Sequence, residues 1–322
     1  MKLELGMPTR EAYGRALLKL GESNPDIVVL DADLSRSTMT VLFAQAWPER
    51  FFDMGIAEQN MVGTAAGLAA SGKIPFVSTF AVFGAGRVYD QLRMCVAYPR
   101  LNVKVAVSHA GLTVGEDGAS HHAIEDVALL RCLPGFTIIV PADEAQTAWA
   151  VEAAVAHFGP VYLRLGRPKV PKVYAAGSQF VLGRAQVARP GRDATIVANG
   201  TMLFAALEAA EICEAQGLDV RVLDLHTVKP IDREAIVAAA RETGALVVAE
   251  EHLLSGGTGS AVAEVLLEEH PVPVSFVALR DTFAESGKPG ELMERYGLTS
   301  GHIVQAVKRV VERKRSGTVA LT

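Results

Sequence analysis

The chain has 322 residues, half of them hydrophobic, and a formal net charge of −5 at pH 7. This length and composition predict two domains, each with its own apolar core. The negative charge argues against nucleic acid or an anionic membrane surface as the main partner, and no stretch has the apolar length of a signal peptide or a membrane span.

The first half of the chain alternates short β-branched segments with longer helical ones. Strands are expected at residues 27–30, 74–77, 103–107, 137–140 and 161–165. Helices are expected at residues 9–20, 59–70, 89–98 and 144–157, with Thr9 as the N-cap of the first. Such alternation is typical of an α/β protein with a mostly parallel sheet.

Prolines and glycines interrupt this pattern between residues 168 and 191, where one weak strand is expected at 179–187. A second alternation follows. Its expected strands are 195–198, 220–223, 245–249 and 274–278, and its expected helices are 202–216, 233–242, 257–269 and 300–314. The sequence therefore predicts two α/β domains with mostly parallel sheets, at residues 1–170 and 192–322, joined by a linker at 171–191.

In the segment from Arg50 to Met61, the acidic residue Glu58 is expected to end a short apolar strand and to begin a helix rich in small residues. In open α/β sheets, ligands bind where the strands end. A carboxylate that is buried there among apolar neighbours could share a proton with a ligand nitrogen. The alternative is an ordinary glutamate at a helix N-terminus, where the helix dipole favours it.

A glycine-rich loop follows the expected strand at 103–107, and residues 108–126 contain three histidines and four acidic residues. Histidine can act as an acid, a base or a phosphate ligand near neutral pH. A polar surface loop is one alternative. A metal site made by His121, His122 and a carboxylate is another, although adjacent histidines point in different directions in most backbones.

Two further segments carry candidate ligand-binding side chains. Phe80 and Phe83 could form an aromatic wall for a flat heterocycle, or belong to the core. Arg164 and Arg167 lie at the end of an expected buried strand, where paired guanidinium donors could clamp a phosphate. The alternative for both is an ordinary surface arginine.

In this order and spacing, the segments resemble the transketolases, most closely the animal-type sequences. The resemblance is carried by GIAEQNMVGTAAGLA, STFAVFG, SHAGLTVGEDGASHHAIED, VLDLHTVKPID, EEH and SGKPG. It covers essentially the whole chain but only the second half of a full-length transketolase. It implies that the two expected domains are a pyrimidine-binding domain and a transketolase C-terminal domain.

The resemblance also implies thiamine diphosphate as the cofactor. Glu58 matches the glutamate that hydrogen-bonds N1′ of the cofactor's pyrimidine and controls its tautomer, and Phe80 and Phe83 match the aromatic residues that pack on that ring. The family's G-D-G motif with its downstream asparagine, which holds the diphosphate and Mg²⁺, is missing. We therefore expect no metal ligand in this chain and a divalent cation held mainly by a partner subunit.

The expected reaction moves a two-carbon ketol unit from a ketose phosphate to an aldose phosphate. His121 stands where the family contacts the donor and intermediate hydroxyls, so Glu58 and His121 form the expected catalytic set. Asp117 matches an aspartate that reads a substrate hydroxyl. The substrate phosphate is expected to be bound by Arg10, Ser37, His109 and Arg167.

The chain departs from the family pattern in two places. Between Phe83 and Asp90 it is one residue longer than the animal pattern, and Gly84, Ala85 and Gly86 replace bulkier residues. Ala119 stands where proline is more common. The first departure leaves open which side chains complete the wall beside the pyrimidine.

Three other functions are compatible with parts of this pattern. One is half of a 1-deoxyxylulose-5-phosphate synthase, in which alanine usually stands at the position of Glu116. Another is the β subunit of a 2-oxo-acid dehydrogenase, which normally has serine in place of Ala57. The third is a non-catalytic scaffold subunit, which has no need of the acidic, basic and histidine residues above.

The expected partner is the diphosphate-binding N-terminal subunit, in an α₂β₂ heterotetramer. A cytoplasmic location is expected, because Cys95, Cys132 and Cys213 are scattered without disulfide or metal-site spacing.

Overall fold

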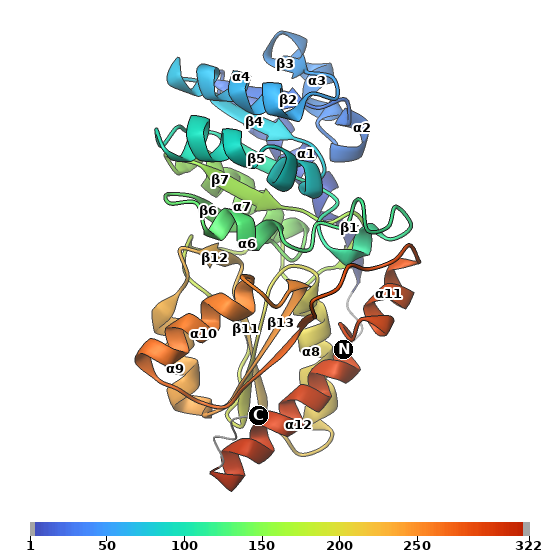
Figure 1. Cartoon of the computed structure of the whole chain (residues 1–322), viewed down its shortest axis with the longest axis vertical. Coiled ribbons are helices and arrows are strands. Elements are labelled where there is room, and N and C mark those ends of the chain that lie inside the picture. Colours follow the sequence, from blue (N-terminus) through green and yellow to red (C-terminus); the bar gives the residue numbers. More distant parts are fainter. Residues whose placement is uncertain (1–3, 318–322) are drawn as a thin grey trace.

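The computed structural model describes residues 4–317. It contains two α/β units stacked along the longest axis of the molecule (Figure 1). Each unit is built around a sheet with mostly parallel strands, so the predicted fold class is confirmed. Among the described residues, no helix is long and apolar enough to cross a membrane.

The first unit has a seven-stranded sheet with the order β12-β6-β7-β5-β4-β2-β3. Its strands are β2 (Ile27–Asp31), β3 (Phe51–Asp53), β4 (Ile74–Ser78), β5 (Lys104–Val107), β6 (Thr137–Ile139), β7 (Val161–Arg164) and β12 (Thr227–Lys229). Every residue of β2, β5 and β7 is buried. Helices on both faces of the sheet explain these continuous buried runs.

Helices α1 and α7 pack over one face of this sheet, while α4, α6 and η3 pack over the other. The helical elements of the unit are α1 (Thr9–Ser23), α2 (Ser35–Thr38), α3 (Val41–Ala46), η1 (Pro48–Arg50), α4 (Glu58–Ala70), η2 (Phe83–Arg87), α5 (Tyr89–Gln91), η3 (Leu92–Ala97), η4 (Leu112–Val114), α6 (Asp126–Arg131) and α7 (Glu144–Ala156). Of these, η2 and η3 have π-helical geometry.

The second unit has a five-stranded sheet with the order β14-β13-β10-β11-β9. Its strands are β9 (Gln186–Arg189), β10 (Ala194–Ala198), β11 (Val220–Asp224), β13 (Leu246–Leu253) and β14 (Val274–Leu279). Its helices are α8 (Met202–Glu214), α9 (Arg233–Thr243), α10 (Thr258–Glu269), α11 (Pro289–Arg295) and α12 (Ser300–Ser316). One core lies under α8 and α12, and another under α9 and α10.

One strand and several polar contacts join the two units. Strand β12 belongs to the second half of the sequence, yet it pairs antiparallel with β6 of the first sheet. The Lys229 ammonium at its end donates to the carbonyls of Arg131 and Leu133 at 2.8 and 2.6 Å. Separately, β8 (Lys169–Pro171) pairs antiparallel with β1 (Leu5–Pro8). The VLDLHTVKPID segment (residues 222–232) contains the end of β11 and the whole of β12, so it runs from the second sheet into the first.

Several local predictions were wrong. Thr9 is not an N-cap, because Pro8 holds that position and the Thr9 hydroxyl accepts a hydrogen bond from the Gly166 amide. The strand expected at 179–187 forms only from Gln186, and as β9 it brings part of the expected linker into the second sheet. The strand before Glu58 ends at Asp53, so a short connection separates the two. The helix expected at 89–98 changes from α to π geometry after Gln91.

Candidate functional site

Glu58 is the first residue of α4, and its side chain is 3% exposed. Its Oε1 accepts a hydrogen bond of 2.6 Å from Nη1 of Arg87, the last residue of η2. The two residues line a cavity of about 420 Å³ together with Ile56, Gln59 and Asn60. A buried carboxylate is thus held at the wall of a cavity, with a cation as its partner.

An aromatic group lies next to this ion pair. The Arg87 guanidinium carbon is 4.2 Å from the centroid of the Phe83 ring. Phe83 is nearly parallel to Phe80, with centroids 6.2 Å apart. The His121 ring meets Phe83 edge-on at 5.4 Å, and His109 stacks on Phe80 at 3.9 Å. Rings from three segments of the sequence therefore form one continuous aromatic surface.

His109 lies two residues after the end of β5, on a backbone turn with φ of +58°. It is 4% exposed, and its Nδ1 lies 2.8 Å from the Ser108 hydroxyl. Burial, with smaller contributions from the positive charges of Arg10 and Arg167, lowers the pKa of His109 to about 3. The ring is therefore neutral at physiological pH, so it can donate one hydrogen bond and accept one.

Arg10 lies in the first turn of α1, and its Nη1 donates to the Ser37 carbonyl at 2.6 Å. The short helix α2, which contains Ser37, is fixed by the buried Asp31 carboxylate, which accepts hydrogen bonds from the Thr38 and Thr40 hydroxyls. Burial and the nearby charge of Arg167 lower the pKa of Arg10. Its Nε is buried without a hydrogen-bond partner in the described structure. Two cations thus share a partly dehydrated corner beside His109, which suits an anionic ligand.

Arg167 follows β7 and reaches the glycine-rich loop. Its Nη1 donates to the Val114 carbonyl and lies 3.7 Å from both the Glu116 and the Asp117 carboxylates. The Asp117 side chain is 40% exposed. His122 is buried instead, with Nε2 at 3.0 Å from the Gly115 carbonyl. The neighbouring histidines thus differ in position, since His121 joins the aromatic group and His122 supports the loop.

Residues of the second unit also contact the glycine-rich loop. Gly118 has φ of +75°, and a Cβ there would lie 2.3 Å from the Ser286 Oγ. Glu251, at the end of β13, accepts hydrogen bonds from the Thr113 amide and the Thr201 hydroxyl. The SGKPG and EEH motifs therefore position the site loop without reaching into the aromatic group.

Arg164 helps to hold the glycine-rich loop in place. It is not part of the anion-binding corner, the region formed by Arg10, Arg167 and His109. Its Nε donates to Asp126 at 2.8 Å, and its Nη2 donates to the carbonyls of Ala123 and Glu251. The side chain is 7% exposed. The hypothesis that Arg164 clamps a phosphate was wrong, because its donors are already used to join the two units.

The residues present fit one half of thiamine diphosphate. A buried carboxylate, which can accept a hydrogen bond from a protonated ring nitrogen, beside an aromatic face is the combination that an aminopyrimidine requires. They do not fit the metal-diphosphate half, because no group of three or more His, Cys, Asp or Glu within residues 4–317 is placed to hold a metal ion.

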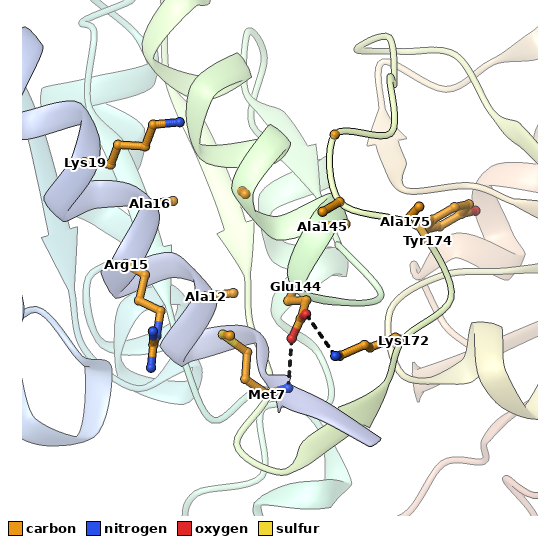
Figure 2. Close-up of a pocket in the computed structure, with 13 residues that line it drawn as sticks. Met7, Ala12, Arg15, Ala16, Lys19, Glu144, Ala145, Lys172, Tyr174 and Ala175 are labelled. Carbon is orange, nitrogen blue, oxygen red and sulfur yellow. Dashed lines mark hydrogen bonds and ion pairs between the residues drawn. The ribbon is translucent and has the colours of Figure 1, made fainter. Parts of the chain in front are cut away.

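A second cavity, of about 480 Å³, lies between α1, α7 and residues 172–177 (Figure 2). Its lining includes neither Glu58 nor any residue of the aromatic group. Alanines form much of its wall. Three of its charged groups are used in local contacts: Glu144 accepts from the Met7 amide and lies 3.8 Å from Lys172, and Arg15 pairs with Glu11. It lacks the converging polar groups of the first site.

Arg87 is the contact residue that the sequence reasoning missed. The one-residue excess between Phe83 and Asp90 was the available signal. The structure forms a π-helical turn over Phe83–Arg87, which is a usual way to accommodate such an excess near a functional site.

Two protein-family models match the chain. The model "Transketolase, pyrimidine binding domain" matches residues 6–172, and "Transketolase, C-terminal domain" matches residues 183–303. The first ends near β8 and the second begins shortly before β9. Together they cover most of the chain.

Individual relatives extend this match. The chain is 45% identical over 305 residues to the 6-deoxy-6-sulfo-D-fructose transketolase subunit SqwH of Clostridium sp. (strain MSTE9), covering 95% of each. It is 40% identical over 309 residues to Transketolase of Rattus norvegicus, but covers only 49% of that protein. The solved structure "Split gene transketolase, inactive beta4 tetramer" has a TM-score of 0.91 at 56% identity, covering 96% of this chain and 100% of that chain. The chain thus matches separate subunits along their whole length and a longer enzyme along about half of its length.

Proposed function

Because this chain belongs to the transketolase family and matches subunits of split transketolases, we propose that it is the half of a two-chain transketolase that binds the cofactor's pyrimidine ring. The reaction is the transfer of a two-carbon ketol unit from a ketose phosphate to an aldose phosphate. One observation carries this proposal: a continuous group of side chains connects Glu58 through the aromatic rings to the cationic corner at Arg10 and Arg167.

Glu58 would control a proton on the cofactor. When bound, thiamine diphosphate would supply the nucleophilic carbon that carries the two-carbon unit. The Glu58 carboxylate would hold a proton at N1′ of the pyrimidine, and Phe80 and Phe83 would keep the ring in the plane that this hydrogen bond requires. Burial supports the assignment, because a carboxylate away from water interacts more strongly with a ring nitrogen.

The anion-binding corner would fix the far end of the sugar. Arg10 and Arg167 would supply the positive charge, while the Ser37 hydroxyl and the neutral His109 ring would complete the hydrogen bonds. Charge-assisted bonds of this kind contribute roughly 1.5–3 kcal/mol each.

His121 and Asp117 would act on the part of the substrate between the cofactor and the anion-binding corner. The His121 ring is edge-on to Phe83, beside the proposed pyrimidine position, and its Nδ1 lies 2.9 Å from the Ser120 hydroxyl. It would orient the hydroxyls of the donor and hold or release a proton there. Asp117 is partly exposed on the same loop and would accept a hydrogen bond from a substrate hydroxyl.

The diphosphate and its Mg²⁺ would be held mainly by a partner subunit, so activity would require both chains. An α₂β₂ assembly would bring each pyrimidine-binding unit against one diphosphate-binding unit. The solved tetramer of β chains is described as inactive, which agrees with a requirement for the second kind of chain. We place the enzyme in the cytoplasm on the sequence argument above, and in pentose phosphate metabolism because the proposed reaction exchanges carbon units between sugar phosphates.

A second candidate substrate class is a sulfonated sugar. The similarity to the sulfofructose transketolase subunit favours it, and paired arginines with neutral donors can bind a sulfonate as well as a phosphate. The two classes differ in charge, since a phosphate monoester is mostly a dianion near pH 7 and a sulfonate is a monoanion.

The test is reconstitution. The purified chain, mixed with its partner subunit, Mg²⁺ and thiamine diphosphate, should transfer a two-carbon unit between sugar phosphates, while either chain alone should not. The same mixture given 6-sulfo and 6-phospho ketoses at equal concentration would rank the two substrate classes by kcat/KM. No turnover and no cofactor binding in the mixture would support the scaffold alternative. Pyruvate as the preferred donor would support the 1-deoxyxylulose-5-phosphate synthase alternative.

A further inference from the structure

We propose that Arg87 occupies the pyrimidine site when the cofactor is absent, and that its guanidinium must leave Glu58 before the ring can bind. This inference rests on the proposed function and adds an autoinhibitory contact to it. Arg87 would be a gating residue and would take no part in the transfer itself.

The geometry shows that one guanidinium blocks both features that the ring would use. Its Nη1 occupies the Glu58 Oε1 at 2.6 Å, where N1′ of a pyrimidine would have to bind. Its central carbon lies 4.2 Å from the Phe83 centroid, over the face against which the ring would stack. A planar cation with hydrogen-bond donors is thus a physical substitute for a protonated aminopyrimidine.

The backbone holds Arg87 in place but leaves its side chain free to swing. The Gln59 Nε2 donates to the Arg87 carbonyl at 3.1 Å, and the π-helical turn Phe83–Arg87 aims the side chain at Glu58. The Arg87 side chain is 44% exposed, whereas the Glu58 side chain is 3% exposed. Release would therefore require side-chain rotation toward solvent and no movement of η2.

Loss of the ion pair would affect Glu58 and Arg87 differently. Glu58 is buried, and a buried carboxylate without a partner is strongly destabilising. Arg87 is half exposed and would be hydrated after release. The pair therefore stabilises the cofactor-free chain, and the cofactor must offer Glu58 a replacement hydrogen bond. A site that is competent for only about a tenth of the time binds its ligand about 10-fold more weakly.

The test compares Arg87→Gln with Arg15→Gln in the reconstituted two-chain complex. Both changes remove a guanidinium that forms an ion pair, but the Arg15–Glu11 pair lies on the outer surface of α1. Binding of thiamine diphosphate with Mg²⁺ is followed by calorimetry and by stopped-flow fluorescence. We expect Arg87→Gln to bind the cofactor about 5- to 10-fold more tightly and with a faster association rate, while Arg15→Gln binds it as the wild type does.

Unchanged or weaker binding by Arg87→Gln would overturn the inference and leave the proposed function intact. Absence of binding by every complex, including the wild type, would overturn both. A separate measurement needs no cofactor: thermal unfolding of the isolated chain with Glu58→Gln, Arg87→Gln and both changes. The Tm losses should be less than additive, because either single change already breaks the pair. Additive losses would also overturn the inference.

Discussion

The imidazole of His109 stacks on the ring of Phe80, with 3.9 Å between their centroids and an angle of 27° between their planes. This stack joins two parts of the proposed site that the sequence separates. Phe80 belongs to the wall beside Glu58, and His109 is influenced by the charges of Arg10 and Arg167. A change at either ring should therefore affect both the cofactor and the anionic end of the substrate.

Replacing Glu58 with Gln should stop turnover while leaving the fold intact. The amide keeps the shape of the side chain but cannot take the proton that the proposed role requires. Proton control of this kind contributes roughly 100-fold or more to a rate, so we expect kcat of the reconstituted enzyme to fall by at least about that factor. Near-wild-type kcat with a normal circular dichroism spectrum would contradict the role.

Replacing Arg167 or Arg10 with Ala should weaken binding of phosphorylated sugars in particular. Loss of one charge-assisted bond costs roughly 1.5–3 kcal/mol, which corresponds to about a 10- to 100-fold rise in KM. The unphosphorylated acceptor should lose much less. Arg15→Ala, on the outer surface of the same helix as Arg10, is the matched control. Equal losses on both acceptors would remove these arginines from the phosphate site.

The neutral His109 should make the folded chain sensitive to acid. Its pKa is about 3 in the folded chain, against an ordinary value of 6.5. Above pH 6.5 both folded and unfolded chains carry a neutral ring, so the residue has no effect on pH dependence. Between pH 6.5 and 3 only the unfolded chain binds the proton, so stability falls as the pH falls.

His109→Asn should remove this part of the pH dependence. The variant should be less stable at neutral pH, because it loses the stack on Phe80. Its unfolding free energy should then decline less between pH 7 and 5, by about 1–2 kcal/mol relative to wild type. Urea unfolding at both pH values measures the difference. Parallel declines in the two proteins would show that His109 is protonated equally in both states.

Gly118→Ala should displace the glycine-rich loop and with it the side chains of Asp117 and His121. A Cβ at residue 118 would meet the Ser286 hydroxyl at 2.3 Å, and the φ of +75° adds backbone strain. Gly177 has a similar φ of +81° but open space around it, so Gly177→Ala separates strain from contact. We expect Gly118→Ala to raise KM for the sugar and lower Tm by several degrees, and Gly177→Ala to lower Tm alone. Identical kinetics in the two variants would mean that the Ser286 contact does not position Asp117 and His121.

Individual elements show why some predictions succeeded. The fold class could be predicted because strands such as β2 and β10 are buried along their whole length and therefore consist mostly of apolar residues. Short elements such as α2 and β12 were missed, because a few residues carry no periodicity. The strand expected at 179–187 failed for a related reason: pairing with β11, and not local composition, decides that β9 begins at Gln186.

The two-part α/β layering, the family resemblance and the side chains that could carry the chemistry were all predicted from the amino-acid sequence. Those properties reside in residue type and spacing, which the chain displays directly. The role of each arginine, in contrast, depends on how the chain folds. Arg164 donates hydrogen bonds that join the two units, Arg167 reaches the glycine-rich loop, and Arg87 pairs with Glu58. The physical reason is that a guanidinium acts on whatever lies within a few ångströms, and those neighbours come from distant parts of the chain.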